Sequence, residues 1–354
     1  MDILKIVSVA ISALIIIMLL RKFNNDYAVA VLCFIGVLIN LFSFGILIPV
    51  FSYIKDLESV SESIGIYSLM LTPYNDDLSV NYKAYEEYAD WQVEQGVEHL
   101  FAVCGSSEMA NLTLDERVKL AELTVKHKGN TTVVATANME PSWFSQVEEV
   151  KRITATGVDG IVFTTKGFGK DPERLVNYVG ELKSYTDLPV FMYEFPGLQP
   201  HLISGEAYGR LVRECGVYGI KDTTCTLEGI KEKIDKKGES CIIQANMPFL
   251  FEAYKLGARG VMATPTACGG AFFQRFHEAF VSGDMELAEK RYNEIILLDN
   301  AIDSGFNCSA KYLVNLQGVS GMKAINRGGQ QLSSARLQSI RAFHNWCVAE
   351  GLMK

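Results

Sequence analysis

The feature that most constrains this chain is a regular alternation of strand-like and helix-like segments, which begins near residue 64 and repeats about every 28 residues. The strand-like segments are short, apolar and β-branched, and they cover residues 65–71, 99–104, 131–136, 159–163, 189–193, 217–221, 241–244 and 259–263. Helical patterns lie between them at residues 82–95, 114–127, 143–156, 173–185, 204–215, 227–237 and 248–256. Eight strands joined by single helices predict parallel βαβ units that close into a (β/α)8 TIM barrel.

An open, doubly wound sheet is the competing fold, because it has the same alternation of strands and helices. Its dinucleotide-binding form carries a GxGxxG motif after the first strand, and no such motif opens a helix here. Eight repeats of nearly equal length favour closure of the sheet into a barrel. We therefore expect a barrel over residues 64–283 and a C-terminal helical extension over residues 284–354, which packs beside the barrel or in an oligomer contact.

The first sixty residues have a different character and explain much of the 49% hydrophobic content. Residues 6–20 and 27–51 are almost wholly apolar, and the polar turn 21–26 separates them. This pattern predicts a two-helix transmembrane hairpin over residues 1–58, joined to the barrel by a short linker at 59–63. A cleaved signal peptide is the alternative, but no small-residue cleavage site follows the first run and a second apolar run does.

Hydropathy and a few polar positions of this segment resemble the amino-terminal hairpin of stage III sporulation membrane proteins of the AC/AD type. The resemblance implies a membrane piece fused to an unrelated, enzyme-like domain. By the positive-inside rule, the turn containing Arg21 and Lys22 faces the cytoplasm, which puts both ends of the hairpin outside. Lys5 and Lys55 near the outer ends weaken that assignment, and the cysteine usage argues the other way for the large domain.

Cysteine usage bears on the compartment of the barrel. The eight cysteines have neither metal-ligand nor disulfide-framework spacing, which is typical of buried thiols in a reducing compartment. We therefore expect membrane attachment through residues 6–51 with the barrel on the cytoplasmic side, or a cytoplasmic protein if the hairpin is not part of the mature chain. A net charge of −8 and the lack of a basic run in the sequence argue against a nucleic-acid partner.

Chemistry in such barrels takes place at the carboxyl ends of the strands. There the sequence places Lys221 at the sixth strand, Tyr193 at the fifth, and Gly105-Ser106-Ser107 after the second, a segment we call the Gly-Ser-Ser turn. A lysine that is buried enough to be neutral can condense with a ketone, and a nearby tyrosine can transfer protons. Backbone N–H groups and hydroxyls of such a turn can hold a carboxylate.

Lys221 on its own has a less interesting interpretation. Val217, Gly219 and Lys221 share one face of a short strand, and a lysine on a buried face is costly unless it is neutralised, paired or used. A lysine at a strand end can also simply reach solvent. The neighbouring segments decide between these possibilities.

Four motifs carry a resemblance to a known family. They are Cys104-Gly105-Ser106-Ser107-Glu108, Leu112-Thr113-Leu114-Asp115-Glu116-Arg117, Leu188-Pro189-Val190-Phe191-Met192-Tyr193-Glu194-Phe195-Pro196 and Gly219-Ile220-Lys221-Asp222. From residue 64 onward the chain resembles the dihydrodipicolinate synthase and N-acetylneuraminate lyase family of class I aldolases.

The resemblance implies a role for each matching residue. Lys221 would form the Schiff base and Tyr193 would transfer protons, whereas Ser106, with Gly105 and Ser107, would hold the carboxylate of a 2-oxo acid. Ala245 and Met262 would line the pocket by family position. The implied partners are a small 2-oxo acid such as pyruvate and an aldehyde, with no cofactor beyond the covalent lysine imine, and the family's oligomers suggest a homodimer or homotetramer.

Three departures from the family pattern bear on the substrate. Gly105 stands where the family has the first hydroxyl of its turn, residues 164–167 replace a tyrosine-bearing turn that reaches a neighbouring subunit, and Leu198 replaces an arginine. That arginine clamps the carboxylate of the second substrate in the synthases. Without a guanidinium fork, aspartate semialdehyde is a poor acceptor, so dihydrodipicolinate synthesis itself is disfavoured.

Structural interpretations compete with several of these roles. Tyr193 could be an ordinary barrel tyrosine, a serine-rich turn can cap a helix, and Ala245 and Met262 could serve packing alone. We expect Glu108 to order its turn, and Asp222 to bond neighbouring loops, because a carboxylate that touched Lys221 would raise the lysine's pKa.

The sequence as a whole predicts a membrane-tethered lyase or synthase that makes or breaks bonds through a lysine imine with a 2-oxo acid. Two other functions stay open. One is a catalytically altered barrel with a binding or scaffolding role at a membrane, and the other is a sporulation membrane component with an appended barrel.

Overall fold

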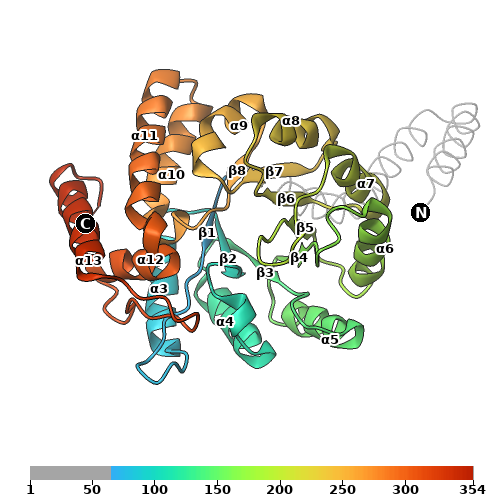
Figure 1. Cartoon of the computed structure of the whole chain (residues 1–354), viewed down its shortest axis with the longest axis horizontal. Helices are drawn as coiled ribbons and strands as arrows, with labels where there is room; N and C mark the ends of the chain where they lie inside the picture. Colours follow the sequence, from blue (N-terminus) through green and yellow to red (C-terminus); the bar gives the residue numbers. More distant parts are fainter. Residues whose placement is uncertain (1–64, 354) are drawn as a thin grey trace, which may run out of the picture. The chain divides into compact units, whose positions relative to one another are not determined.

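The computed structural model describes residues 65–353, and in this part of the chain eight parallel strands form a closed barrel. The strands follow one another around the ring in sequence order, and β8 pairs with β1. Figure 1 shows this ring with the helices outside it. The strands are β1 Gly65–Leu69, β2 His99–Val103, β3 Thr132–Thr136, β4 Gly160–Thr164, β5 Val190–Tyr193, β6 Gly219–Asp222, β7 Cys241–Gln244 and β8 Gly260–Val261. The predicted barrel is therefore confirmed, and the open sheet is excluded.

The outer layer consists of one helix after each strand. These helices are α3 Tyr82–Glu94, α4 Leu114–His127, α5 Trp143–Thr154, α6 Pro172–Lys183, α7 Gly205–Cys215, α8 Leu227–Lys236, α9 Leu250–Leu256 and α10 Thr266–Val281. Short 3-10 turns occupy Met109–Asn111, Met247–Phe249 and Asp303–Gly305. The sequence pattern did not predict α10, because its backbone leaves helical geometry at Gly269 and this break interrupts the hydrophobic period.

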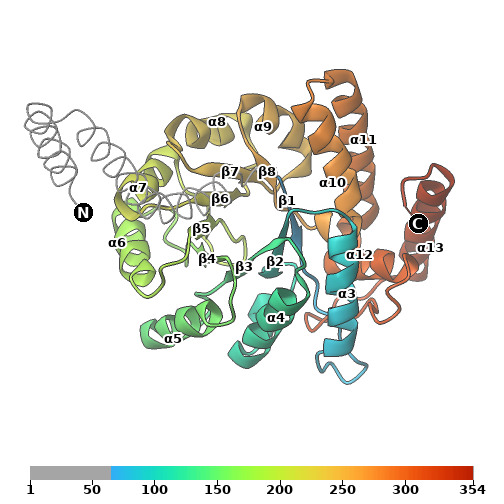
Figure 2. The ribbon, with the colours of Figure 1, turned by 180° about the vertical axis from the view of Figure 1, so that it is seen from behind.

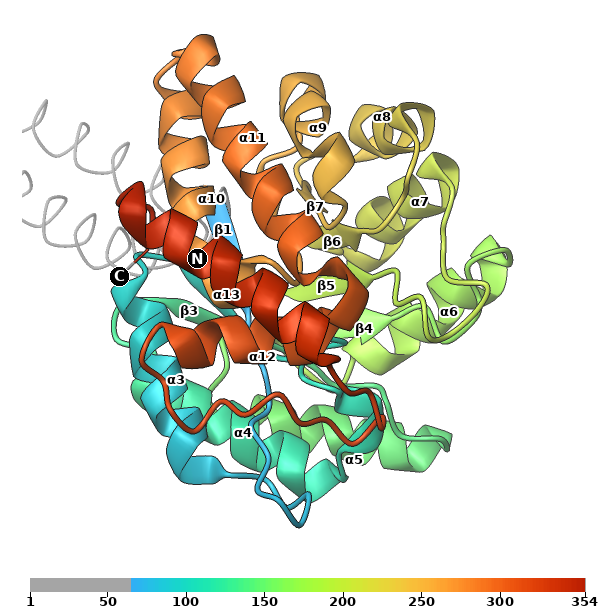
Figure 3. The ribbon, with the colours of Figure 1, turned by 60° about the vertical axis from the view of Figure 1, so that its left-hand side comes forward.

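The C-terminal extension consists of three helices that lie to one side of the barrel: α11 Met285–Ile302, α12 Phe306–Leu316 and α13 Ser334–Ala349. Seen from the front and from behind, α11 lies beside α10, and α13 lies farthest out from the barrel (Figures 1 and 2). The segment between α12 and α13 runs past the barrel loops before α13 crosses over α12 (Figure 3). In this segment Lys323 pairs with Asp76, and Arg327 donates to the backbone carbonyls of Leu78 and Asn111. The extension therefore contacts the loops that follow β1 and β2.

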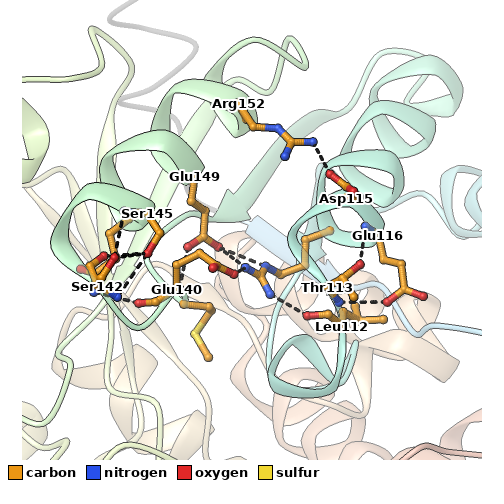
Figure 4. Close-up of polar contacts among 12 residues, drawn as sticks. Leu112, Thr113, Asp115, Glu116, Glu140, Ser142, Ser145, Glu149 and Arg152 are labelled. Atoms are coloured by element: carbon orange, nitrogen blue, oxygen red, sulfur yellow. Dashed lines mark hydrogen bonds and ion pairs between the residues drawn. The ribbon is translucent and has the colours of Figure 1, made fainter.

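Side-chain caps fix where the outer helices begin. Thr113 accepts the backbone N–H of Glu116, whose carboxylate accepts the N–H of Thr113 in return, and Ser142 forms the same box with Ser145 (Figure 4). Such caps satisfy N–H groups that have no partner within the helix. The helices α9 and α10 begin without a side-chain cap of this kind.

A buried charge cluster joins α4 to the loop after β3. The Arg117 guanidinium donates to Glu149 Oε1 at 3.1 Å, to Glu140 Oε1 at 2.6 Å and to the carbonyl of Leu112 at 2.7 Å. Glu140 and Glu149 converge on this point from the loop and from α5 (Figure 4). A buried arginine needs such partners, since an unpaired buried charge is strongly destabilising. The cluster therefore holds one side of the barrel mouth in place.

Aromatic rings fill the amino-terminal half of the barrel interior. Tyr67 stacks on His99 with ring centroids 4.1 Å apart, and Phe191 meets Tyr67 edge-on at 6.1 Å. Burial lowers the pKa of His99 to about 4, so its imidazole is neutral at physiological pH. Because this end of the interior is packed, a small molecule can enter only from the carboxyl ends of the strands.

The predicted hairpin, the linker and the resemblance to sporulation proteins all fall within residues 1–64, outside the part of the chain that the structure describes. Within residues 65–353, no helix is both long enough and apolar enough to cross a membrane.

Candidate active site

Lys221 and Tyr193 meet inside the barrel because they are register partners on neighbouring strands. β5 and β6 pair with Tyr193 opposite Lys221, so both side chains point to the same face. Lys221 Nζ lies 4.3 Å from the centroid of the Tyr193 ring and 5.4 Å from that of Phe101. Lys221 is only 4% exposed, which rules out a lysine that escapes to solvent.

The charge state of Lys221 follows from this burial. Burial lowers the pKa of its ammonium group from the ordinary value near 10.5 to about 8, with a small opposing effect from the Cys104 thiol. In the described part of the chain, no carboxylate forms an ion pair with it, in contrast to the salt bridges that Lys233 makes nearby. About a tenth of the amine is therefore unprotonated at pH 7 and can act as a nucleophile, far more than for an ordinary lysine.

The carboxylates next to this pair point the other way. Tyr193 is followed by Glu194 and Lys221 by Asp222, and alternation along a strand turns these acids to the outer face of the barrel. There both lie 2.8 Å from Nζ of Lys233, a buried lysine on α8. Asp222 also accepts the backbone N–H of Thr224 at 2.9 Å, so it bonds a neighbouring loop as the sequence predicted.

Backbone donors complete this outer network. Glu194 accepts the N–H of Ile203 at 2.8 Å and that of Thr223 at 3.0 Å. Burial raises the pKa of Glu194 to about 7 against the opposing effect of Lys233. Burial alone would lower the pKa of Lys233, but Glu194 and Asp222 together raise it above its ordinary value. The barrel wall thus separates an inner lysine without acids from an outer lysine with two.

The Gly-Ser-Ser turn lies at the same mouth, and its two serines are engaged differently. The Ser106 hydroxyl is hydrogen-bonded to that of Thr264, with 2.8 Å between the oxygens. The Ser107 hydroxyl accepts the backbone N–H of Cys104 at 2.6 Å and donates back to the Cys104 carbonyl at 3.1 Å. Ser107 therefore orders its own turn, and the binding of a carboxylate by Ser106 stays a prediction.

Glu108 orders the turn from its far end, as expected. It adopts a left-handed backbone with φ of 61°, and its carboxylate lies 2.6 Å from the buried Lys311 Nζ and accepts the backbone N–H of Arg327 at 2.8 Å. Both partners belong to the C-terminal extension. The extension therefore fixes the backbone conformation next to the Gly-Ser-Ser turn.

Gly105 has a steric reason to be glycine in this structure. A Cβ at that position would lie 2.8 Å from the Tyr193 hydroxyl oxygen and 3.1 Å from the Phe195 ring. Real Cβ atoms do not approach so closely without displacing a neighbour. The family has a hydroxyl-bearing side chain at this position. In this structure such a side chain would collide with the Tyr193 hydroxyl, so the glycine and the position of Tyr193 depend on each other.

The other predicted residues lie at the ends of the last strands. Ala245 follows β7 and donates its backbone N–H to Asp222 O at 2.9 Å, whereas Met262 follows β8 and is fully buried. Their contact with substrate stays a prediction. Leu198 is partly exposed, and Lys166 donates to the Glu140 carbonyl at 3.1 Å, which holds it against the loop after β3.

The sequence reasoning missed three residues that support the site, Lys233, Lys311 and Arg327, and it gave no role to Thr264, which it placed after the eighth strand. A signal was present for Lys233, because it lies on the same face of its helix as the apolar Ile230 and Ile234, where a lysine interrupts the hydrophobic period. No local pattern points to Lys311, whose partner Glu108 is 203 residues away in the chain.

The comparison with known families now identifies the barrel. The model of the Dihydrodipicolinate synthetase family matches residues 62–340, so the chain belongs to this family. Members are lyases or synthases of the class I aldolase type that form a covalent lysine Schiff base with pyruvate and need no external cofactor. They act on pyruvate and aldehydes and form oligomers. The match begins at residue 62, so it lends no support to the resemblance stated for the hairpin.

Curated relatives are similar over most of the barrel. The 4-hydroxy-tetrahydrodipicolinate synthase of Shewanella pealeana is 25% identical over 221 residues, which cover 62% of this chain and 75% of the relative. That of Parvibaculum lavamentivorans is 26% identical over 260 residues, which cover 72% of this chain and 88% of the relative.

Solved structures show the same fold. A prophage protein of the dihydrodipicolinic acid synthase family from E. coli K12, solved with pyruvate, gives a TM-score of 0.74 at 19% identity and covers 80% of this chain and 98% of its own. The N-acetylneuraminate lyase of Fusobacterium nucleatum gives 0.74 at 20% identity, over 80% and 99% of the two chains. At these identities the likeness concerns the fold alone.

Proposed function

We propose that this protein is a Schiff-base-forming lyase or synthase that cleaves or makes the C3–C4 bond of a 2-oxo acid, with pyruvate as one partner. The observation that carries the proposal is Lys221, a buried amine with a pKa of about 8 that forms no ion pair with a carboxylate among residues 65–353. Imine formation requires an unprotonated amine, and burial is the means by which proteins obtain one from lysine.

In the cleavage direction, Lys221 Nζ attacks C2 of the 2-oxo acid, and loss of water gives a protonated imine. The C4 hydroxyl then gives up its proton, the C3–C4 bond breaks, and its electrons move through C3 into the imine to form an enamine. An aldehyde leaves. Protonation of the enamine at C3 and hydrolysis release pyruvate and restore the Lys221 amine.

Tyr193 is the residue we assign to these proton transfers. Its ring lies 4.3 Å from Lys221 Nζ, and burial raises the pKa of its hydroxyl, so the phenol is protonated and can donate to the departing water. The same hydroxyl can take up and return protons while the bond breaks. The Gly-Ser-Ser turn supplies hydroxyl and N–H groups at the mouth for the C1 carboxylate.

Dihydrodipicolinate synthesis itself is not the activity we propose. Leu198 occupies the position of the arginine that recognises the second carboxylate in the synthases, and a leucine cannot replace a guanidinium fork. The acceptor is therefore an aldehyde that does not depend on that carboxylate contact.

Reductive trapping tests the proposal. Sodium borohydride added with pyruvate should reduce the imine to a stable adduct, which intact mass detects on the full-length protein. Lys221→Ala should abolish the adduct, whereas Lys231→Ala, which removes an exposed lysine on α8, should leave it unchanged. If no adduct forms with a panel of 2-oxo acids, the enzymatic proposal is wrong, and a binding or scaffolding role for the barrel becomes the better explanation.

We also propose that residues 6–51 attach the barrel to a membrane with the barrel on the cytoplasmic side. The two apolar runs in the sequence support the attachment, and the cysteine usage, typical of a reducing compartment, supports the cytoplasmic side. Membrane partition of the full chain should be compared with that of a chain that starts at Ser63. Equal solubility of the two would contradict the attachment and leave a cytoplasmic enzyme.

A further inference from the structure

The backbone pairing of β5 and β6 weakens where the two strands reach the barrel mouth. At the start of the pair, the Tyr218 N–H donates to the Val190 carbonyl at 2.8 Å. At its end, the Glu194 N–H donates to the Lys221 carbonyl at 3.4 Å, which is longer than the usual range of about 2.7–3.2 Å for such a bond. Backbone bonds therefore hold the carboxyl ends of these strands less firmly than their beginnings.

Side chains on the outer face of the barrel join the same two strand ends. Lys233 Nζ lies 2.8 Å from Glu194 Oε1 and 2.8 Å from Asp222 Oδ1, and it also donates to the Thr224 hydroxyl. Glu194 directly follows β5, and Asp222 is the last residue of β6. One ammonium group on α8 thus connects two strands. We call Lys233, Glu194 and Asp222 the outer ion cluster.

Asp222 depends strongly on this lysine. Its Oδ1 accepts the Lys233 ammonium group and the Thr224 N–H, whereas its buried Oδ2 has no hydrogen-bond partner among residues 65–353. Without the lysine, the two buried carboxylates of the cluster would repel each other. Neither carboxylate can move far without moving the strand end that carries it. The cation therefore keeps the ends of β5 and β6 together.

Each acid of the cluster is next to a residue of the proposed reacting pair. Glu194 follows Tyr193, and Asp222 follows Lys221. Consecutive side chains of a strand point to opposite faces, so a shift of the outer acid also shifts the backbone of its inner neighbour. The distance of 4.3 Å between Lys221 Nζ and the Tyr193 ring centroid thus depends on the cluster. A misplacement of about 1 Å between reacting groups can slow an enzyme about a hundredfold.

We propose that Lys233 is a positioning residue: through the outer ion cluster it sets the distance between Lys221 and Tyr193 from the far side of the barrel wall. The proposal rests on the function proposed above, since that function makes these two inner residues the reacting pair. Lys233 lies on the outer side of the wall, so it acts on the geometry of the pair and not on the substrate.

A triple variant tests this role. Lys233→Met alone can fail to fold, because it leaves two buried carboxylates without their cation. Lys233→Met/Glu194→Gln/Asp222→Asn removes all three charges with little change in side-chain size. Replacing a whole buried ion cluster is often neutral for stability, in contrast to removing one partner. We therefore expect the triple variant to be folded by circular dichroism and to unfold near the wild-type urea midpoint.

The rate of imine formation separates positioning from a purely structural role. At saturating pyruvate, the initial rate of borohydride-trapped adduct formation should fall about tenfold in the triple variant. The half-saturating pyruvate concentration and the pH midpoint of the rate should stay at their wild-type values, because the burial of Lys221 does not change. A wild-type rate in the folded variant would overturn the proposal. So would a shifted pH midpoint, which would show that the cluster acts through its charge.

The matched control is Lys231→Met/Asp235→Asn, which removes an exposed ion pair from the same helix. This double variant should change neither the rate of adduct formation nor its pH midpoint. A tenfold loss of rate in the control as well would show that any change on α8 disturbs the site, and it would contradict a specific role for Lys233.

A second measurement reports the geometry without imine chemistry. Lys221 Nζ lies over the Tyr193 ring, so the ring current should shift the Lys221 Hε protons upfield. In full-length protein labelled with ¹³C at lysine Cε, the signal that disappears in Lys221→Ala identifies these protons. It should move towards the signals of exposed lysines in the triple variant and stay in place in the control. This shift can be measured even if no 2-oxo acid gives an adduct, so a failure of the proposed function remains distinguishable.

Two results of this measurement would contradict the proposal. One is a Lys221 signal that is not shifted in the wild-type protein, and the other is a signal that stays equally shifted in the triple variant. Either would show that the outer ion cluster does not set the position of Lys221 over the Tyr193 ring.

Discussion

Two buried lysines on opposite sides of the barrel wall show how this fold separates reactivity from stability. Lys221 is 4% exposed and faces the interior, and Lys233, on α8, is 1% exposed and faces the outside of β6. Burial acts on both in the same direction, yet the pKa of Lys221 falls to about 8 and that of Lys233 rises. The difference is the position of Glu194 and Asp222, both of which lie against Lys233.

Lys311 is an intermediate case. It is fully buried, and among residues 65–353 its single carboxylate partner is Glu108. Burial lowers its pKa, and Glu108 opposes this without reversing it. The pKa of a buried lysine in this protein therefore follows the number of acids beside it. One residue of offset along each strand is enough to decide on which side of the wall those acids lie.

The largest expected effect is on the outer lysine. Lys233→Met leaves two buried carboxylates without their cation, so we expect the free energy of unfolding to fall by about 3–5 kcal/mol. Urea denaturation followed by circular dichroism measures this loss. Lys231→Met, in an exposed pair with Asp235, should change the free energy of unfolding by less than about 0.5 kcal/mol. Similar losses for the two variants would show that Lys233 is not the counter-ion.

The same substitution at the inner lysine, Lys221→Met, should raise the free energy of unfolding at pH 7 instead of lowering it. Because the folded pKa of Lys221 lies below its unfolded value near 10.5, the unfolded chain binds more protons between pH 8 and 10.5. Wild-type stability should therefore rise with pH in this window. Lys221→Met lacks that rise, so it should be about 1–3 kcal/mol more stable than wild type at pH 7.

That advantage should disappear above pH 10.5. Parallel urea titrations of wild type and Lys221→Met at pH 7, 9 and 10.5 measure it. A variant that is less stable than wild type at pH 7 would mean that the buried amine has a favourable partner.

A substitution at Gly105 tests the packing around Tyr193 on the inner face of the barrel. Gly105→Ala should push the Tyr193 hydroxyl and the Phe195 ring away and cost about 1–3 kcal/mol of stability, with slower formation of the borohydride-trapped adduct. Gly180→Ala, within helix α6, is the matched control, because a Cβ at that position meets only Cys215 Sγ, at 3.6 Å. That control should stabilise the protein by about 0.5–1 kcal/mol. Normal adduct formation in Gly105→Ala would separate Tyr193 from the chemistry.

The smallest effect concerns the pH dependence of imine formation. The unprotonated fraction of Lys221 reaches about one half at pH 8 and about nine tenths at pH 9. The initial rate of pyruvate adduct formation should therefore rise from pH 6 to about pH 9 and then level off. A rate that continues to rise up to pH 10 would indicate an ordinary, solvated lysine pKa.

The sequence was sufficient to predict the barrel because strand, helix and turn signals agreed over eight repeats. It also placed Lys221 and Tyr193 correctly, since alternation along a strand and equal repeat length decide which residues reach the mouth. The eighth helix, α10, which the sequence pattern did not predict, shows the limit of this reasoning. α10 begins after Pro265 and changes direction at Gly269, so its pattern does not have one helical period.

The sequence could not show how the acids are distributed. Glu194 and Asp222 are each adjacent to a proposed catalytic residue, and nothing local tells whether they neutralise Lys221 or turn away from it. Their partner Lys233 comes from the following helix, and the partners of Glu108 lie about two hundred residues further along the chain. Contacts of this kind depend on the packing of helices against the barrel, which a pattern of hydrophobic residues does not specify.

The contact between Glu108 and Lys311 also has a consequence for the synthesis of the chain on the ribosome. The two residues are 203 positions apart, and at about 5–20 residues per second a ribosome needs about 10–40 s to make the chain between them. By the end of that interval every strand of the barrel has been made, including the one with the reactive lysine. The turn beside Glu108 is thus among the first parts of the mouth to be translated and among the last to be fixed, so a nascent chain has its nucleophile before it has a finished binding site.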